Sequence, residues 1–141
     1  MMSDEAELQE FAERLVRLVR DRSIVACDRL ATGESRGVLG ERWHDVLVSD
    51  VARHALTALI PDIVDQVLFE LLNAVDNGDL PLGWRGADHS FVALEEIGYG
   101  EMSGWLMMGA GGWLERLSTQ RFFDPHANLH LREDSTDSND A

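Results

Sequence analysis

The stretch that most constrains the fold is residues 61–78, PDIVDQVLFELLNAVDNG, because every local signal in it indicates one helix. Pro61 suits the first turn of a helix, where its missing N–H would have had no partner. Asp62 and Asp65 place negative charge beside the positive end of the helix dipole, and Gly78 supplies a left-handed stop. The apolar residues cover roughly half of the circumference at ~100° per residue: Ile63, Val64, Val67, Leu68, Leu71, Leu72, Ala74 and Val75. A face this wide needs neighbours on two sides, so we expect the central helix of a small bundle.

The bulk composition is typical of a soluble globular protein. The chain has 141 residues, 45% of them hydrophobic, and a mean hydropathy of −0.17, which allows one domain with a real core. No apolar run approaches the roughly 18–20 residues that span a bilayer. The N-terminus, MMSDEAELQE, is acidic where a secretory signal would be basic and then apolar. We therefore expect a cytoplasmic protein that does not bind membranes.

Charge is the strongest bulk property. Twelve basic residues, all of them arginine, stand against 26 acidic residues, which gives a net charge of −14. The absence of lysine removes the Walker-type phosphate lysine and Schiff-base chemistry. So negative a chain repels nucleic acid and anionic lipid, and it favours a basic protein partner or divalent cations. Cys27 is the single cysteine, so no intrachain disulfide can form, which fits a reducing compartment.

The sequence before the central helix predicts two further helical regions. Residues 4–22 carry an apolar stripe at helical spacing, with an interruption expected near Ser23 and a short apolar piece at 24–30. Cys27 lies in that piece, where we expect it to pack as a small hydrophobic residue. After a glycine-rich connector, residues 41–60 form the next helix. It should end before Pro61, because the residue before proline is disfavoured in helical conformation.

The sequence after the central helix is rich in turns and glycines. We expect a strand at 80–84 to pair with another at 91–94 in a hairpin. Residues 95–119 return to a helical pattern that contains Gly104, Gly109, Gly111 and Gly112. Each glycine costs about 1 kcal/mol relative to alanine, so either another helix approaches closely or the helix breaks near residues 109–112. We expect close packing against the central helix.

The predicted fold is thus mainly α. A single domain over residues 1–131 would contain a bundle of about five helices around 61–78, with a small β-hairpin near 80–94. Residues 121–131 would lie across the bundle. Residues 132–141, REDSTDSNDA, have the composition of a disordered acidic tail.

Candidate partner-binding residues gather in the hairpin region and the segment that follows it. Trp84, Arg85 and Tyr99 belong to residue types that often anchor interfaces. Nearby acidic side chains could steer a basic partner: Glu95, Glu96 and Glu101. No serine or cysteine stands in a nucleophile motif such as Gly-x-Ser-x-Gly, so we assign no catalytic residue and no cofactor.

The polar side of the central helix supplies further candidates. Phe69 falls among polar residues by helical phase, so either a neighbouring element covers it or it is an exposed interface anchor. Asp62 and Asp65 would add steering charge on the same side.

A metal site is the main alternative. Asp62 and Asp65 lie one turn apart, and carboxylates on facing helices can hold magnesium. The DIVD segment resembles the carboxylate helix of all-α nucleotide pyrophosphohydrolases. The Glu-x-x-Glu pair that completes the site in that family is absent from the upstream helix, ERWHDVLVSD. The resemblance covers about a dozen residues and implies a metal-dependent hydrolase acting on nucleotides, in which Asp65 and Glu101 would converge on the metal.

On charge and size we favour a small acidic protein-binding module, in the form of an inhibitor or immunity-type protein that masks a basic partner. A homo-oligomeric regulatory or scaffold subunit is the third interpretation. In that case an exposed apolar patch over residues 105–113 would mediate a homodimer.

Overall fold

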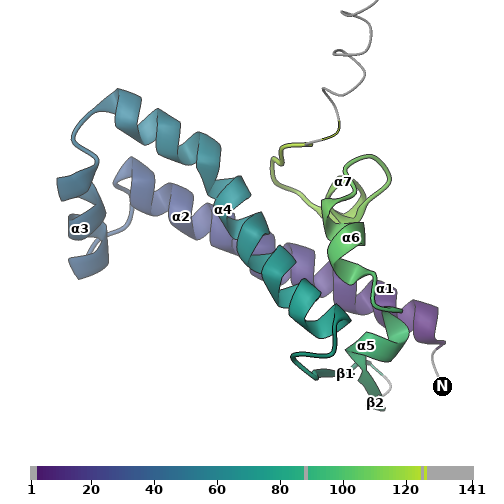
Figure 1. The fold of residues 1–141 in the computed structure, drawn as a ribbon. Coiled ribbons are helices and arrows are strands. Elements are labelled where there is room, and N and C mark those ends of the chain that lie inside the picture. Colours follow the sequence, from purple (N-terminus) through teal and green to yellow (C-terminus); the bar gives the residue numbers. More distant parts are fainter. Residues whose placement is uncertain (1–2, 88, 125, 127–141) are drawn as a thin grey trace, which may run out of the picture.

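The computed structural model describes residues 3–87, 89–124 and 126, which form a mainly helical fold with a small two-stranded antiparallel sheet (Figure 1). This confirms the predicted fold class. The predicted tail, 132–141, lies outside the described residues. Within the described part of the chain, no helix is long and apolar enough to cross a membrane.

The chain begins with one long helix rather than two pieces. It consists of α1 (Asp4–Arg14), a π-helical segment η1 (Leu15–Asp21) and α2 (Arg22–Thr32). The predicted interruption at Ser23 is therefore wrong. Serine disfavours a helix by only a few tenths of a kcal/mol, and the packing of fully buried Ile24 outweighs that preference.

The next two helices are α3 (Val38–Val46) and α4 (Asp50–Asp76), so the predicted boundary at residues 60–61 is also wrong. The chain turns between α3 and α4, where the Ser49 side chain accepts a hydrogen bond of 3.1 Å from the Ala52 N–H and caps α4. Pro61 lies in the interior of α4. The central helix of the prediction is thus the second half of a longer helix.

A contact from Arg121 offsets part of the cost of Pro61 inside α4. A proline has no N–H, so the carbonyl four residues earlier, that of Thr57, loses its helical partner. The Arg121 guanidinium donates to this oxygen at 2.7 Å. Arg121 also makes two hydrogen bonds of 2.8 Å to Asp28 of α2, so one side chain satisfies the orphaned carbonyl and links both long helices.

The predicted β-hairpin forms, but its first strand begins three residues later than the expected 80–84 and its second ends one residue earlier than the expected 91–94. Strands β1 (Gly83–Arg85) and β2 (Phe91–Ala93) pair antiparallel, with Trp84 opposite Val92. Gly83 lets the Phe91 ring lie over the strand, because a Cβ would come within 1.9 Å of that ring and displace it.

The predicted helix over residues 95–119 is instead three short helices: α5 (Leu94–Ile97), α6 (Met102–Met107) and α7 (Trp113–Leu117). Gly100, Gly109 and Gly111 adopt positive φ angles, so the glycines break the helix rather than permit one continuous helix. The expected contact with the central helix does exist, because α6 packs against α4.

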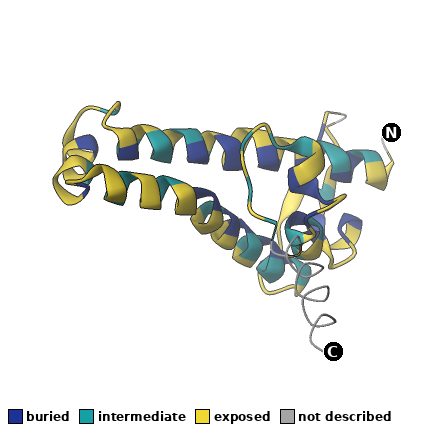
Figure 2. Cartoon of the chain, turned by 90° about the horizontal axis from the view of Figure 1, so that it is seen from above, coloured by how far each residue is buried: buried dark blue, intermediate teal, exposed yellow. Residues whose placement is uncertain are grey.

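Two apolar clusters of very different size hold the fold together. Among the described residues, thirteen buried apolar residues form a core where α1, η1, the second half of α4 and helices α5–α7 meet. Only four form the second cluster: Ile24, Ala31, Leu47 and Ile60. We call residues 22–64, which hold this second cluster, the arm, and the rest of the described fold the body. Figure 2 shows exposed residues dominating the part of the arm formed by α3 and the start of α4.

Candidate functional site

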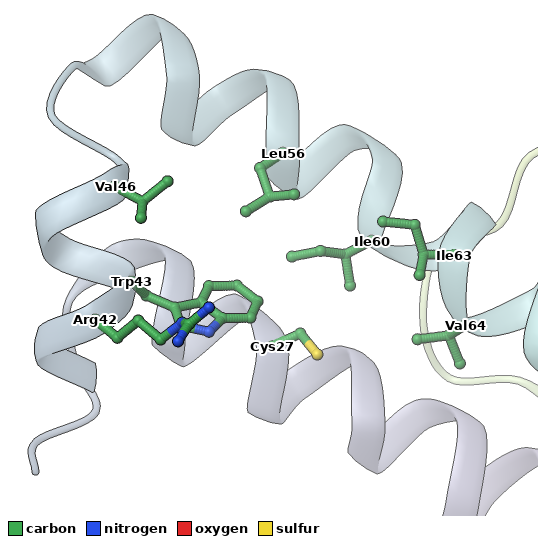
Figure 3. Close-up of a pocket in the computed structure, with 8 residues that line it drawn as sticks. All are labelled: Cys27, Arg42, Trp43, Val46, Leu56, Ile60, Ile63 and Val64. Carbon is green, nitrogen blue, oxygen red and sulfur yellow. The ribbon is translucent and has the colours of Figure 1, made fainter. Parts of the chain in front are cut away.

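An apolar groove opens between α2, α3 and α4 in the arm (Figure 3). Its volume is about 480 Å³. In Figure 3, Val46 of α3 and Leu56 of α4 extend toward one another across it. Eight side chains from the three helices line it: Cys27, Arg42, Trp43, Val46, Leu56, Ile60, Ile63 and Val64.

Small local features set α3 across the end of the two longer helices. Gly37 has a φ angle of 95° just before α3. Gly40 is buried, and a Cβ on it would lie 2.2 Å from the Ser35 carbonyl oxygen, so only glycine lets the helix fold back onto the connector. After α3, the side chain of Leu47 is buried in the second cluster. The glycine-rich connector therefore shapes the groove.

The groove is continuous with exposed apolar surface. On its rim, Val46 is 72% exposed and Ile63 is 54% exposed. Leu59 and Val67, four residues to either side of Ile63 on α4, are 53% and 65% exposed. Residues four apart lie on one side of a helix, so these α4 side chains form a stripe beside the groove. We call Val46, Leu59, Ile63 and Val67 the arm stripe; Val67 extends it three residues past the arm into the body.

The arm carries almost no net charge. Five arginines and six acidic residues fall in residues 22–64, a net of −1, against −14 for the whole chain. Arg42 is the only charged residue that lines the groove. The strong negative charge of the protein is thus borne by the remaining residues, and the groove lies in a nearly neutral region.

Cys27 packs as the sequence predicts, half-buried against the second cluster. Burial, with a further contribution from the charge of Asp28, raises the pKa of its thiol. A raised pKa lowers the thiolate fraction at neutral pH, which is the opposite of what a nucleophile requires. Cys27 is therefore part of the apolar lining.

Four of the predicted partner-binding residues come together at one corner of the body. Glu95 and Glu96 lie on α5, and Tyr99 and Glu101 lie in the turn to α6, all of them exposed. Tyr99 is 74% exposed and has a φ angle of 51°. The corner is fixed by Asp76 at the end of α4, whose carboxylate accepts hydrogen bonds from two backbone N–H groups at the start of α6.

The hairpin residues lie elsewhere and are partly structural. Trp84 is half-buried, stacks edge-on against Phe11 at 5.5 Å and donates to the Glu7 carboxylate at 3.0 Å. Arg85 is exposed, with its guanidinium 5.9 Å from the centre of the Phe91 ring. Trp84 thus fastens the hairpin to α1.

The three partner-binding candidates on the central helix lie in different environments. Asp62 is exposed on the arm, whereas Asp65 is 4% exposed and faces inward. Phe69 is half-buried and packs against the core of the body, so a neighbouring element covers it and it is not an exposed interface anchor. The three residues therefore do not form one surface.

Asp65 belongs to a buried polar network that the sequence analysis missed. Fully buried Arg20 donates to both oxygens of Asp65, at 2.5 and 3.0 Å, and to Asp21 at 3.1 Å. It also donates to the Ser118 hydroxyl and the Arg121 carbonyl, so all five guanidinium N–H groups are used. Helical spacing could have indicated that Arg20 is buried, because it lies four residues from both Val16 and Ile24 on the apolar side of the helix.

The structure does not provide the residue arrangements that two of the sequence-based alternatives require. Among residues 3–87, 89–124 and 126, no group of three or more potential ligands is placed to hold a metal ion, and Asp65 is paired with Arg20 rather than with Glu101. The expected dimer patch over residues 105–113 is not exposed as a whole, since Trp113 is 2% exposed and stacks with Trp105. Met108 is the large apolar side chain of this patch that is exposed, at 46%, whereas the exposed apolar side chains beside a groove, those of Val46 and Ile63, lie on the arm.

Comparisons with protein-family models, with curated proteins and with solved structures found no match.

Proposed function

We propose that this protein acts by binding another protein and that the groove of the arm, with the arm stripe beside it, is its docking surface. The observation that carries the proposal is an apolar groove of about 480 Å³ whose rim side chains Val46 and Ile63 are more than half exposed. Contiguous exposed apolar surface of this kind is typical of protein interfaces. A partner's apolar side chains would gain about 25 cal/mol for each Å² removed from water.

The shape of the groove favours a protein over a small molecule as its occupant. Small-molecule sites usually combine an enclosed apolar cavity with several converging polar groups. This groove offers one charged side chain, that of Arg42, and it continues along the exposed side of α4. An amphipathic helix laid into such a groove is a common mode of recognition.

A masking role toward a basic protein is a second proposal, and it concerns the body. Its support is that Tyr99, 74% exposed, lies within four residues along the chain of the exposed carboxylates Glu95, Glu96 and Glu101. A segment that exposes an aromatic side chain and several carboxylates suits a positively charged surface, and the encounter would weaken as salt screens the charges.

The two proposals are separated by affinity capture from native cell lysate with matched variants. The wild type is compared with Ile63→Arg, which places a charge on the groove rim, and with Val51→Arg, which makes a similar change at a residue that is 80% exposed. Val51 precedes Ile63 by twelve residues, which places it about 120° away around the helix.

Proteins retained by the wild type and Val51→Arg but lost by Ile63→Arg would support the groove as the docking surface. Retention of the same proteins by all three baits would refute it. A basic protein that is released by moderate salt and lost by Tyr99→Ala would support the masking role at the acidic corner.

A further inference from the structure

The arm has a face that no part of the described chain covers. In the body, α1 and the second half of α4 are enclosed by α5, α6 and α7, and thirteen apolar residues become buried. In the arm, α2 and α4 are covered only by α3 across their end and by the residues around Arg121 along one edge. Only four apolar residues of the described arm become buried in its cluster. Two helices alone cannot enclose a core, so the arm is structurally incomplete.

Charge indicates which partner this face suits. The arm has a net charge of −1, with five arginines and six acidic residues interspersed, whereas the remainder of the chain has −13. A basic partner would be drawn to the remainder and not to the arm. A surface that is apolar and carries both signs in balance is compatible with a copy of itself.

We propose that the occupant of the groove is a second copy of this chain, bound arm to arm in a twofold-symmetric dimer. This inference rests on the proposed docking surface and names its partner. The α2–α4 pairs of two copies would enclose a shared four-helix core, with each arm stripe covered by the other copy. Packing the arms in opposite directions would place the two acidic bodies at opposite ends, where their repulsion is screened.

The arm is long enough for such an interface. Residues 50–67 of α4 span ~27 Å at ~1.5 Å per residue, and a helix is ~10 Å wide. With α2, whose 11 residues span ~16 Å, the two helices present a projected face of ~430 Å² per copy, or ~860 Å² in total. Accessible area exceeds projected area, so the total approaches the lower end of the ~1,200–2,000 Å² of stable interfaces.

The end of the chain is a poor alternative occupant on composition. Residues 127–141 contain two leucines, Leu129 and Leu131, among mainly polar residues, four of them acidic. A segment of this composition cannot replace the apolar surface of two helices.

Sedimentation velocity of the full chain tests the proposal, between ~1 and ~100 μM, where small interfaces dissociate. The wild type and Val51→Arg should shift from 15.8 kDa toward twice that mass as concentration rises. The Ile63→Arg and Val67→Arg variants should remain monomeric with unchanged helical circular dichroism. Because the contact is apolar and nearly neutral, the wild-type dimer should persist when the salt concentration is raised tenfold.

Cys27, the single cysteine, provides a second readout in the wild type without any substitution. Its reaction with an aromatic disulfide reagent at alkaline pH should slow several-fold as the protein concentration rises, because the second copy covers the groove. A wild type that stays monomeric throughout this range overturns the proposal. So does a dimer that Ile63→Arg and Val67→Arg leave intact, or one in which Cys27 stays equally reactive.

Failure of the dimer is distinguishable from failure of the docking surface. A monomeric wild type that still captures lysate proteins in an Ile63-dependent manner would reject the second copy and keep the groove. Capture that is independent of Ile63 would reject the groove itself.

Discussion

Replacing Asp65 by alanine should destabilise the fold severely, because it leaves the Arg20 guanidinium buried without its main partner. Arg20 is 0% exposed, and two of its five side-chain hydrogen bonds, at 2.5 and 3.0 Å, go to Asp65. A solvent-exposed steering charge or a metal ligand at this position would not contribute to stability in this way. The substitution therefore distinguishes a structural role from a functional one.

The magnitude follows from the partners that remain. Removing one member of a buried ion pair costs about 3–5 kcal/mol. Asp21, 3.1 Å from the same guanidinium, stays in place, so we expect the lower part of that range, about 3–4 kcal/mol. Domains of this size are stable by about 5–15 kcal/mol, so the loss is a large share of the total.

Urea unfolding followed by far-ultraviolet circular dichroism measures this loss. The midpoint should fall by ~1–2 M, given a slope of ~2–3 kcal/mol per M. All proteins should carry Ile63→Arg, so that self-association does not contribute to the measured stability. The matched control is Asp62→Ala, the same change at an exposed carboxylate on the same helix, which should stay within about 0.5 kcal/mol.

A double variant, Arg20→Met with Asp65→Leu, should lose less stability than Asp65→Ala, since it leaves no buried charge uncompensated. The reasoning would be refuted by an Asp65→Ala protein whose stability lies within about 1 kcal/mol of the Asp62→Ala control.

Two further predictions concern the backbone. Arg121→Ala should lower the free energy of unfolding by about 1–2 kcal/mol. The loss should be smaller in a Pro61→Ala background, because alanine restores the N–H that the Thr57 carbonyl lacks. A double-mutant cycle in urea measures this coupling, and additive losses would contradict it. Gly104→Ala should raise stability by about 0.5–1 kcal/mol, since a Cβ there meets nothing within 4 Å. Gly86→Ala should instead lower the melting temperature, because its Cβ would lie 2.0 Å from the Glu7 carboxylate, and equal melting temperatures for the two variants would contradict the difference.

The sequence alone predicted the features that depend on short-range signals. The left-handed stop at Gly78 and the hairpin over residues 83–93 were correct because turn residues and strand propensity act within a few positions. The mainly helical fold followed from apolar periodicity, which each segment carries by itself.

Only the tertiary structure decided how these segments join. Pro61 disfavours a helix by its local chemistry, yet α4 continues through it. Ile60 and Pro61 are buried by tertiary packing, and Arg121, sixty residues later, donates to the carbonyl that proline leaves free. Arg20 and Asp65 appear in the sequence as ordinary charged residues, and their pairing exists because two distant helices cross there.

The candidate site divides in the same way. The sequence placed Glu95, Glu96, Tyr99 and Glu101 near one another because they lie within one short segment, and the fold keeps them together. Residues of three helices line the arm groove, and the exposure of Val46 and Ile63 depends on how the other elements pack around them. Periodicity identifies an apolar face, but only the packed chain determines whether that face is buried or open to a partner.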